Sequence, residues 1–342
     1  MLNPPDGLRA DMLTTALADG WGLHVVSLGY LPLGFGSHHW EVADANGTRW
    51  FATADDLAAR RRSRSEPLDE VFGRLSASLA IPVALSDLGR TFAVAPIPAV
   101  RGEPLLRLTD GFSLALYPFI EGQSFRWGEF RTEEHRRGLL DMIISVHTAP
   151  AAGSERAMTD DLSILFRDEL DAALDGVPAA DSGPYGRKTA ELVAAHRDRL
   201  RRLLASYDAL AARVRSGTQR LVLTHGEPHA GNTMRSEQGW LLIDWDTALI
   251  SDPERDLFTL DAGDGMMLEA YRQATGTVPR PEALELFRMR WDITDIALSV
   301  GEFRAPHQGD ANEAKSFNRL GALLNGTAGY LSQADPVPQH PG

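Results

Sequence analysis

The sequence predicts an α+β protein with a small antiparallel β lobe followed by a larger helical lobe. In the first 118 residues, short or alternating apolar runs are separated by glycine and asparagine turns, as in strands. Beyond Gly128, apolar residues recur at three- and four-residue steps, which is typical of helices. We therefore divide the chain into residues 1–118, residues 119–332, and a flexible tail at 333–342 whose composition favours disorder.

Composition narrows the class of partner. The 342 residues are 43% hydrophobic and 24% charged, as in an ordinary globular protein. A net charge of −13 disfavours nucleic acid and anionic membranes as partners and would suit a cationic small molecule. The chain has no cysteine, which excludes disulfides and thiolate metal sites. It begins without a signal peptide and has no bilayer-length apolar run, so we expect a cytoplasmic protein.

The first lobe is predicted to start with a helix over residues 4–19. Strands are expected at residues 23–33, 40–42 and 48–52, and Asn46-Gly47 is a strong hairpin signal between the last two. Two further strands, at residues 90–98 and 112–118, complete a sheet of five antiparallel strands.

A helix is expected between the third and fourth strands, over residues 55–79, with Ser65-Glu66-Pro67 as a candidate interruption. It carries the run Arg60-Arg61-Arg62 followed by Arg64. Because charge runs usually face water, we expect these arginines to form a solvated face. In the second lobe we expect helices at residues 133–148, 160–173 and 185–215.

The residues with the clearest chemistry lie between positions 221 and 250. Apolar runs at residues 221–223 and 240–243 read as strands that a turn at residues 236–239 joins into a hairpin. This arrangement would bring Glu227, Asn232 and Asp244 into one small volume. Phosphoryl transfer from a nucleotide needs oxygen ligands for magnesium and a carboxylate that orients the attacking hydroxyl. These three side chains could supply both.

The stretch HGEPHAGN, followed by IDWD, resembles the catalytic loop and metal-binding Asp of the aminoglycoside phosphotransferase and choline kinase family. It looks most similar to the spectinomycin phosphotransferase-like branch. The resemblance implies a protein-kinase-like two-lobed fold with ATP and Mg²⁺ as cofactors. It makes Glu227 the catalytic base, His225 the residue that fixes the catalytic loop, and Asn232 and Asp244 the magnesium ligands. It also implies that Asp256 anchors the loop.

This sequence departs from the family pattern at the base, where Glu227 replaces the usual Asp. Glutamate is one methylene longer, and a misplacement of about 1 Å can lower a rate by a large factor.

The resemblance also places a nucleotide site in the first lobe. Gly34, Gly36, Ser37 and His38 would hold the phosphates, because a glycine turn lets backbone N–H groups approach closely. A tight turn without a ligand is the alternative. The adenine would bond to backbone groups near Phe119 and Ile120, in a segment that resembles the hinge between lobes.

Kinase-like folds place a lysine on the third strand to hold the phosphates. Thr53 stands about where that lysine is expected. Either Arg49, His38 or His39 substitutes for it, or the phosphates are held less tightly. The two histidines could in principle bind a metal, but neighbouring residues on a strand point to opposite faces.

Acidic residues near the C-terminus are candidates for acceptor binding. Asp292 and Asp295 lie three residues apart and share a helix face. With Asp261 and Trp291 they could line a pocket for an amine-bearing substrate, as the equivalent helices do in relatives. A solvated acidic face is the alternative.

Together these features predict an ATP- and magnesium-dependent O-phosphotransferase acting on a small hydroxylated metabolite. An aminocyclitol or aminoglycoside antibiotic is the leading candidate, which would make this a resistance enzyme. Two alternatives remain open: a kinase-like enzyme acting on Ser or Thr of a peptide, and a nucleotide-binding pseudokinase with a regulatory role. The missing lysine and the altered base favour the pseudokinase.

Overall fold

The computed structural model describes residues 3–5, 7–34, 36–128, 130–150, 157–179 and 181–330. The chain forms two compact units. Unit 1 comprises Met1–Arg61, Glu66–Asp160 and Arg220–Val278, and unit 2 comprises Arg62–Ser65, Asp161–Gln219 and Pro279–Gly342. This division differs from the predicted lobes, so the boundary at residue 118 stays a prediction. The predicted tail lies outside the described residues.

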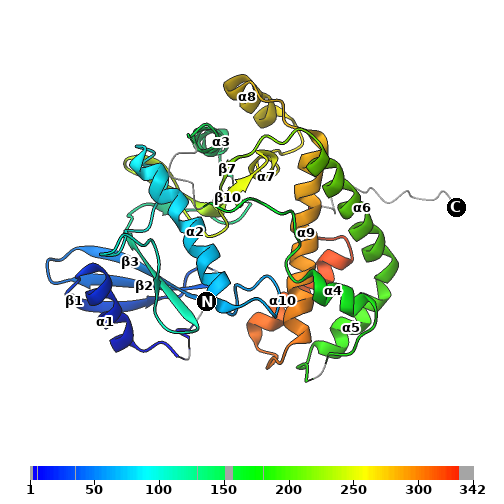
Figure 1. Cartoon of the computed structure of the whole chain (residues 1–342), viewed down its shortest axis with the longest axis horizontal. Coiled ribbons are helices and arrows are strands. Elements are labelled where there is room, and N and C mark those ends of the chain that lie inside the picture. The colour runs from blue at the N-terminus through cyan, green and yellow to red at the C-terminus, as the bar shows by residue number, and fades with distance from the viewer. Residues whose placement is uncertain are drawn as a thin grey trace. The chain divides into compact units, whose positions relative to one another are not determined.

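Unit 1 contains an antiparallel five-stranded sheet in the order β1-β2-β3-β5-β4. Its strands, coloured blue to green in Figure 1, are β1 (Val25–Leu31), β2 (Ser37–Asp44), β3 (Arg49–Asp56), β4 (Leu106–Arg107) and β5 (Phe112–Pro118). The turn between β2 and β3 falls at the predicted hairpin, where Gly47 has φ +80°. The prediction of five antiparallel strands is confirmed.

One of the predicted strands is wrong. Residues 90–98 form no strand of the sheet and meet it only where Ile97 N donates to Leu116 O at 2.7 Å, and the fifth strand is β4 instead. Val94 N donates to Leu242 O at 3.0 Å, so the segment pairs locally with a different sheet. Pro96 and Pro98 have no N–H group, which prevents a regular ladder here.

Helix α1 (Ala10–Trp21) packs against this sheet (Figure 1). It buries Leu13 and Leu17 in a cluster with Val42 and Leu114 from the strands. The helix ends at Gly22, which has the left-handed conformation that glycine adopts without strain. The predicted helix starts too early, because the helical conformation begins only at Ala10.

The helix predicted over residues 55–79 is also misplaced. Strand β3 continues to Asp56, and helix α2 spans Leu68–Asp87. Alternation decides the first boundary, since Ala52 and Ala54 are buried on one face of β3. Pro67 decides the second, because proline is well suited to the start of a helix.

Two small sheets carry the segment between residues 221 and 251. Strand β7 (Val222–Thr224) pairs with β10 (Leu249–Ser251), and β6 (Gln123–Ser124), β8 (Thr233–Ser236) and β9 (Gly239–Leu242) form the other sheet. The predicted hairpin between residues 221–223 and 240–243 is therefore wrong. The turn exists, but it joins β8 to β9, because a tight turn pairs the strands that directly flank it.

Helices complete both units. Unit 1 has α3 (Glu133–His147), α7 (Glu254–Leu257) and α8 (Met266–Thr275). Unit 2 has α4 (Arg167–Leu174), α5 (Gly186–Ala195), α6 (Arg197–Ser216), α9 (Pro281–Arg304) and α10 (Ala311–Leu324). In unit 2, α4, α5, α6 and α10 all pack on α9 (Figure 1).

Three helices were predicted in this part of the chain. The helix predicted at 133–148 is confirmed, the one at 160–173 starts late, and the one at 185–215 is interrupted at His196. Of the helices in the described ranges, none has the length and apolar character to cross a membrane.

Candidate active site

A single buried carboxylate fixes the loop that follows β7. Asp256, fully buried on α7, accepts hydrogen bonds from His225 N at 2.8 Å and from Gly226 N at 2.6 Å. Gly226 has φ +100°, and a β-carbon there would come within 2.3 Å of the Arg255 guanidinium. The anchoring role expected of Asp256 is confirmed, and it requires glycine beside it.

Asp256 is itself held by a chain of buried polar groups. His147 Nε2 lies 3.1 Å from Asp256 Oδ2, and His147 Nδ1 lies 3.0 Å from the Tyr271 hydroxyl. Burial opposes the charge of Asp256, but the hydrogen bond with His147 and the charge interactions with His147, Arg255 and His225 together outweigh it, and the pKa is lowered. Asp256 is therefore a carboxylate at neutral pH, able to accept from both amides.

His225 connects the loop to the segment that follows β9. Its Nδ1 accepts from Glu227 N at 3.2 Å, so its Nε2 carries the proton and donates to Ile243 O at 2.9 Å. Burial lowers the pKa of His225, which keeps the ring neutral in this role. The ring thus orients backbone on both sides of the site.

Asn232 ties the end of the loop to its start. The side-chain Nδ2 of Asn232 donates to Glu227 O at 3.0 Å. The backbone carbonyl oxygen of Asn232 accepts from Ile243 N at 2.9 Å. The second bond places the residue before Asp244 directly against Asn232. The two predicted metal ligands are thus brought together through backbone pairing.

Asp244 carries the clearest electrostatic signature of the site. Its φ is +67°, a conformation that aspartate tolerates better than most residues. The negative charge of Asp246, then desolvation of the Asp244 carboxyl, and then the charge of Glu227 raise the pKa of Asp244 well above the usual value. Asp244 therefore lies close enough to Asp246 and to Glu227 to be repelled by both.

This excess of negative charge fits a cation. Within the described ranges, no three His, Cys, Asp or Glu side chains are grouped to hold a metal by themselves. Asn232 and Asp244 offer the oxygen donors that magnesium prefers, and magnesium usually completes its shell with water and phosphate oxygens. The residues present fit a metal that arrives with a nucleotide.

His229, which was not predicted as a site residue, lies beside Glu227, and Trp127, also not predicted, packs on His229. His229 Nε2 is 3.9 Å from Glu227 Oε2, and the pKa of His229 is lowered to about 4 by burial and by His225. Trp127 packs edge-on against His229 with ring centroids 6.2 Å apart and remains 54% exposed. The sequence signal for His229 is its position two residues after Glu227. No sequence signal points to Trp127.

The glycine turn has φ +65° at Gly34 and +90° at Gly36. Ser37, at the start of β2, is buried and donates to Asp55 Oδ1 at 2.8 Å. The next two side chains point to opposite faces: His38 Nδ1 lies 3.2 Å from the Tyr30 hydroxyl, whereas His39 packs on Phe51. Phosphate binding by this turn and by His38 stays a prediction.

Arg60 does not lie on the solvated face that was predicted for it. Its side chain is only 19% exposed and pairs with Asp55 and Asp246. It also donates to Ser37 Oγ at 2.8 Å. The sequence did contain a signal for a buried Arg60: acidic residues are in excess at the ends of β3 and β9, and buried carboxylates need a cation beside them.

At the opposite end of β3, Arg49 is engaged elsewhere. It pairs with Glu41 at 2.6 Å and Glu121 at 2.8 Å, and its guanidinium lies 3.7 Å above the Phe119 ring. Phe119 N donates to Arg49 O at 3.4 Å. The adenine contacts predicted at Phe119 and Ile120 are untested.

The predicted acceptor residues fall in different units. Asp261 is in unit 1 and accepts from Gly263 N at 3.1 Å. Trp291, Asp292 and Asp295 lie on α9 in unit 2. Asp295 pairs with Arg319, and Trp291 packs edge-on against Tyr330. Their role in acceptor binding stays a prediction.

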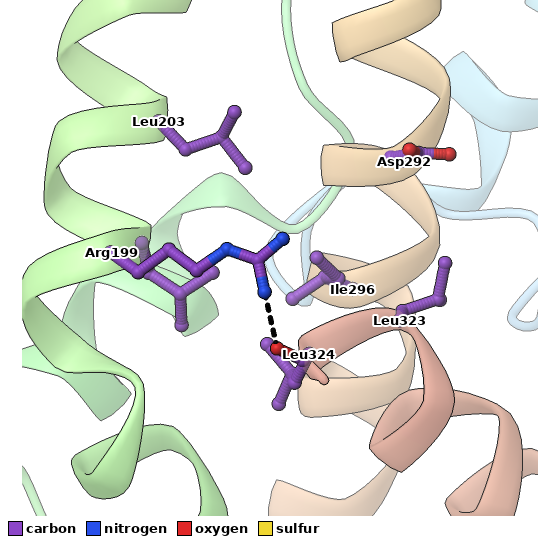
Figure 2. A pocket seen from close by; sticks show the side chains of 7 residues that line it. Arg199, Leu203, Asp292, Ile296, Leu323 and Leu324 are labelled. Atoms are coloured by element: carbon purple, nitrogen blue, oxygen red, sulfur yellow. Dashed lines mark hydrogen bonds between the residues drawn. The ribbon is translucent and has the colours of Figure 1, made fainter. Parts of the chain in front are cut away.

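Asp292 lies at a small hollow of unit 2 lined mainly by leucines (Figure 2). It is 2% exposed and accepts from Tyr330 N at 3.1 Å. Across the same hollow, Arg199 donates to Leu324 O at 2.6 Å, the dashed line in Figure 2. Both charged side chains therefore already contact the backbone.

The fold and the clamped loop are those expected of a kinase-like phosphotransferase, and comparison with known proteins agrees. Residues 32–288 match the phosphotransferase enzyme family known as APH, and the chain belongs to this family. It is thus an enzyme that transfers a phosphoryl group to an alcohol. Protein StrN of Streptomyces griseus is 31% identical over 266 residues, covering 74% of this chain and 77% of StrN.

Solved structures share the fold at low identity. The spectinomycin phosphotransferase APH(9)-Ia, in complex with ADP and spectinomycin, has a TM-score of 0.69 at 16% identity, over 94% of this chain and 98% of its own. Choline kinase LicA from Streptococcus pneumoniae has a TM-score of 0.55 at 13% identity, over 92% and 98%. The predicted kinase-like fold is confirmed.

Proposed function

We propose that this enzyme is an ATP- and magnesium-dependent O-phosphotransferase acting on a hydroxyl of a small metabolite, with an aminocyclitol or aminoglycoside-type antibiotic the favoured class. The observation that carries the proposal is the clamped loop, in which Asn232 donates to the Glu227 carbonyl and the charge of Glu227 acts on Asp244. The spectinomycin complex of a structural neighbour and the net charge of −13 favour a cationic cyclitol or sugar.

In the proposed mechanism, Glu227 accepts the proton of the acceptor hydroxyl at a carboxylate oxygen. The hydroxyl oxygen bonds to the γ-phosphorus while the bond to the β-phosphate oxygen breaks, and ADP leaves. Magnesium, held by Asn232 and Asp244, would neutralise phosphate charge when bound. His225 and Asp256 hold the loop backbone, so that Glu227 needs little reorganisation during transfer.

The side of Glu227 that His229 faces suits a sugar-like acceptor. Trp127 presents an exposed aromatic ring there, and His229 is neutral because its pKa is lowered to about 4 by burial. An apolar ring face beside a base can support the carbon face of a cyclitol while leaving its hydroxyls to polar groups.

The test is phosphorylation of a panel of aminocyclitols, aminoglycosides and Ser- or Thr-containing peptides with ATP and magnesium. Mass spectrometry should show a gain of one phosphate on at least one aminocyclitol or aminoglycoside. Glu227→Gln should lower kcat by about 10²- to 10⁴-fold. Glu237→Gln, the same change at an exposed turn, should leave kcat unchanged. Phosphate gain on peptides alone would refute the proposed acceptor class.

A nucleotide-binding pseudokinase is the second candidate. The observation favouring it is Thr53, which bonds His39 at 3.1 Å where kinase-like folds have a lysine. If ADP binds but no acceptor gains phosphate, and Glu227→Gln leaves ADP binding intact, this candidate replaces the first.

A further inference from the structure

The strand position that holds a lysine in kinase-like folds carries no cation here. Thr53 lies on β3 opposite His39, and its hydroxyl is 3.1 Å from His39 Nδ1. A nucleotide's phosphates carry several negative charges, so the site needs a cation besides any metal. The question is which side chain of unit 1 supplies it.

Arg60 lies where three parts of the predicted nucleotide site meet. Its Nε donates to Asp55 Oδ1 at 2.8 Å, at the end of β3. Its Nη2 donates to Ser37 Oγ at 2.8 Å, next to the glycine turn, and its Nη1 donates to Asp246, two residues beyond Asp244. One guanidinium thus joins the turn, the strand and the acidic segment.

The local charge balance favours a role for Arg60 beyond bracing. Asp55, Asp244 and Asp246 all interact electrostatically with this guanidinium, so the carboxylates outnumber it. A polyphosphate entering such a site would be repelled unless cations face it. Arginine suits this task, because its planar fork can bond carboxylate and phosphate oxygens at the same time.

The other candidates named from the sequence fit less well. Arg49 lies at the far end of β3 from Asp55, where it pairs with Glu41 and Glu121. His38 and His39 have pKa values lowered by burial, that of His39 to about 4, so both rings are neutral at physiological pH. Neither ring offers the positive charge that phosphates need.

We propose that Arg60 takes the place of the strand lysine, bracing the glycine turn against Asp246 and presenting its guanidinium to the α- and β-phosphates of the nucleotide. The proposal rests on the proposed function, since it assumes that a nucleotide binds beside Asp244. Arg60 would act on nucleotide binding, while Glu227 acts on the acceptor.

The test compares adenosine, ADP and ATP binding by calorimetry in wild type and Arg60→Gln. Adenosine has no phosphate, so its affinity should change by less than about threefold. The affinities for ADP and ATP should fall by about 10- to 100-fold, the range expected for a hydrogen bond to a charged group. An equal loss for adenosine and ADP, or no loss for either, would overturn the proposal, because Arg60 would then be only a brace or have no role.

Two further variants keep the test decisive if Arg60→Gln does not fold. Arg60→Lys keeps the charge that balances Asp55 and Asp246 and should retain much of the preference for ADP over adenosine. Thr53→Lys combined with Arg60→Gln moves the cation to the strand and should restore that preference. A folded double variant that does not regain the preference for ADP over adenosine would contradict the proposal that Arg60 replaces the strand lysine.

Arg9→Gln is the matched control. Arg9 is an exposed arginine of unit 1 that pairs with Asp11 at the protein surface. Its loss removes the same charge and should leave all three affinities unchanged. The proposed function fails separately, if wild type itself binds ADP no better than adenosine.

Discussion

Replacing Asp256 by asparagine tests the idea that one buried carboxylate holds the catalytic loop. The carboxylate accepts from His225 N and Gly226 N on its two oxygens. Asparagine has one acceptor oxygen, so one buried N–H loses its partner at a cost of about 1–3 kcal/mol. The remaining bond changes from charged to neutral and weakens by about 1 kcal/mol. We therefore expect Asp256→Asn to lose about 2–4 kcal/mol of unfolding free energy.

The assay is urea unfolding followed by circular dichroism, paired with kcat for phosphate transfer. Tyr271→Phe, which removes only the hydroxyl at His147, should cost about 1 kcal/mol. Asp69→Asn makes the same change at a side chain that is 93% exposed and should stay within about 0.5 kcal/mol of wild type. An Asp256→Asn protein as stable and as active as wild type would refute the clamp.

The difference in unfolding free energy between wild type and Asp256→Asn should depend on pH with a definite sign. The pKa of Asp256 is lowered by its bond to His147, against the opposing effect of burial. The stabilisation is therefore complete above the ordinary carboxyl pKa, near 4, and is lost as pH falls through the lowered value. The gap between wild type and Asp256→Asn should shrink below about pH 4.

Three further predictions concern backbone strain, titration and packing. Gly226→Ala should cost about 1–3 kcal/mol and reduce kcat, because φ is +100° and the new methyl meets Arg255. His39→Gln should weaken the dependence of the unfolding free energy on pH between about pH 4 and pH 6.5. In wild type, as the pH falls, His39 is protonated in the unfolded chain before it is protonated in the folded chain, since burial lowers the folded pKa to about 4. The free energy of unfolding of wild type therefore rises with pH in this range. Leu17→Ala should cost about 2–5 kcal/mol in urea, and the exposed Val26→Ala under about 0.5 kcal/mol.

Local patterns predicted much of the fold and the chemistry of the loop. Alternating burial along β2 and β3, and the Asn46-Gly47 turn, gave the hairpin because both signals act between near neighbours. The same local reasoning failed at residues 90–98, where an apolar run has strand composition but two prolines lack N–H groups.

By itself, the sequence determined which residues could carry the chemistry, because Glu227, Asn232 and Asp244 follow a fixed spacing on one short segment. Only the tertiary structure decided how they are held. Arg60 and Asp246 are 186 residues apart, and no periodicity records that one guanidinium joins them. β7 likewise pairs with β10 rather than with the nearer β9. Burial creates these partnerships, since an enclosed charge or strand edge must be matched by whatever chain the fold brings beside it.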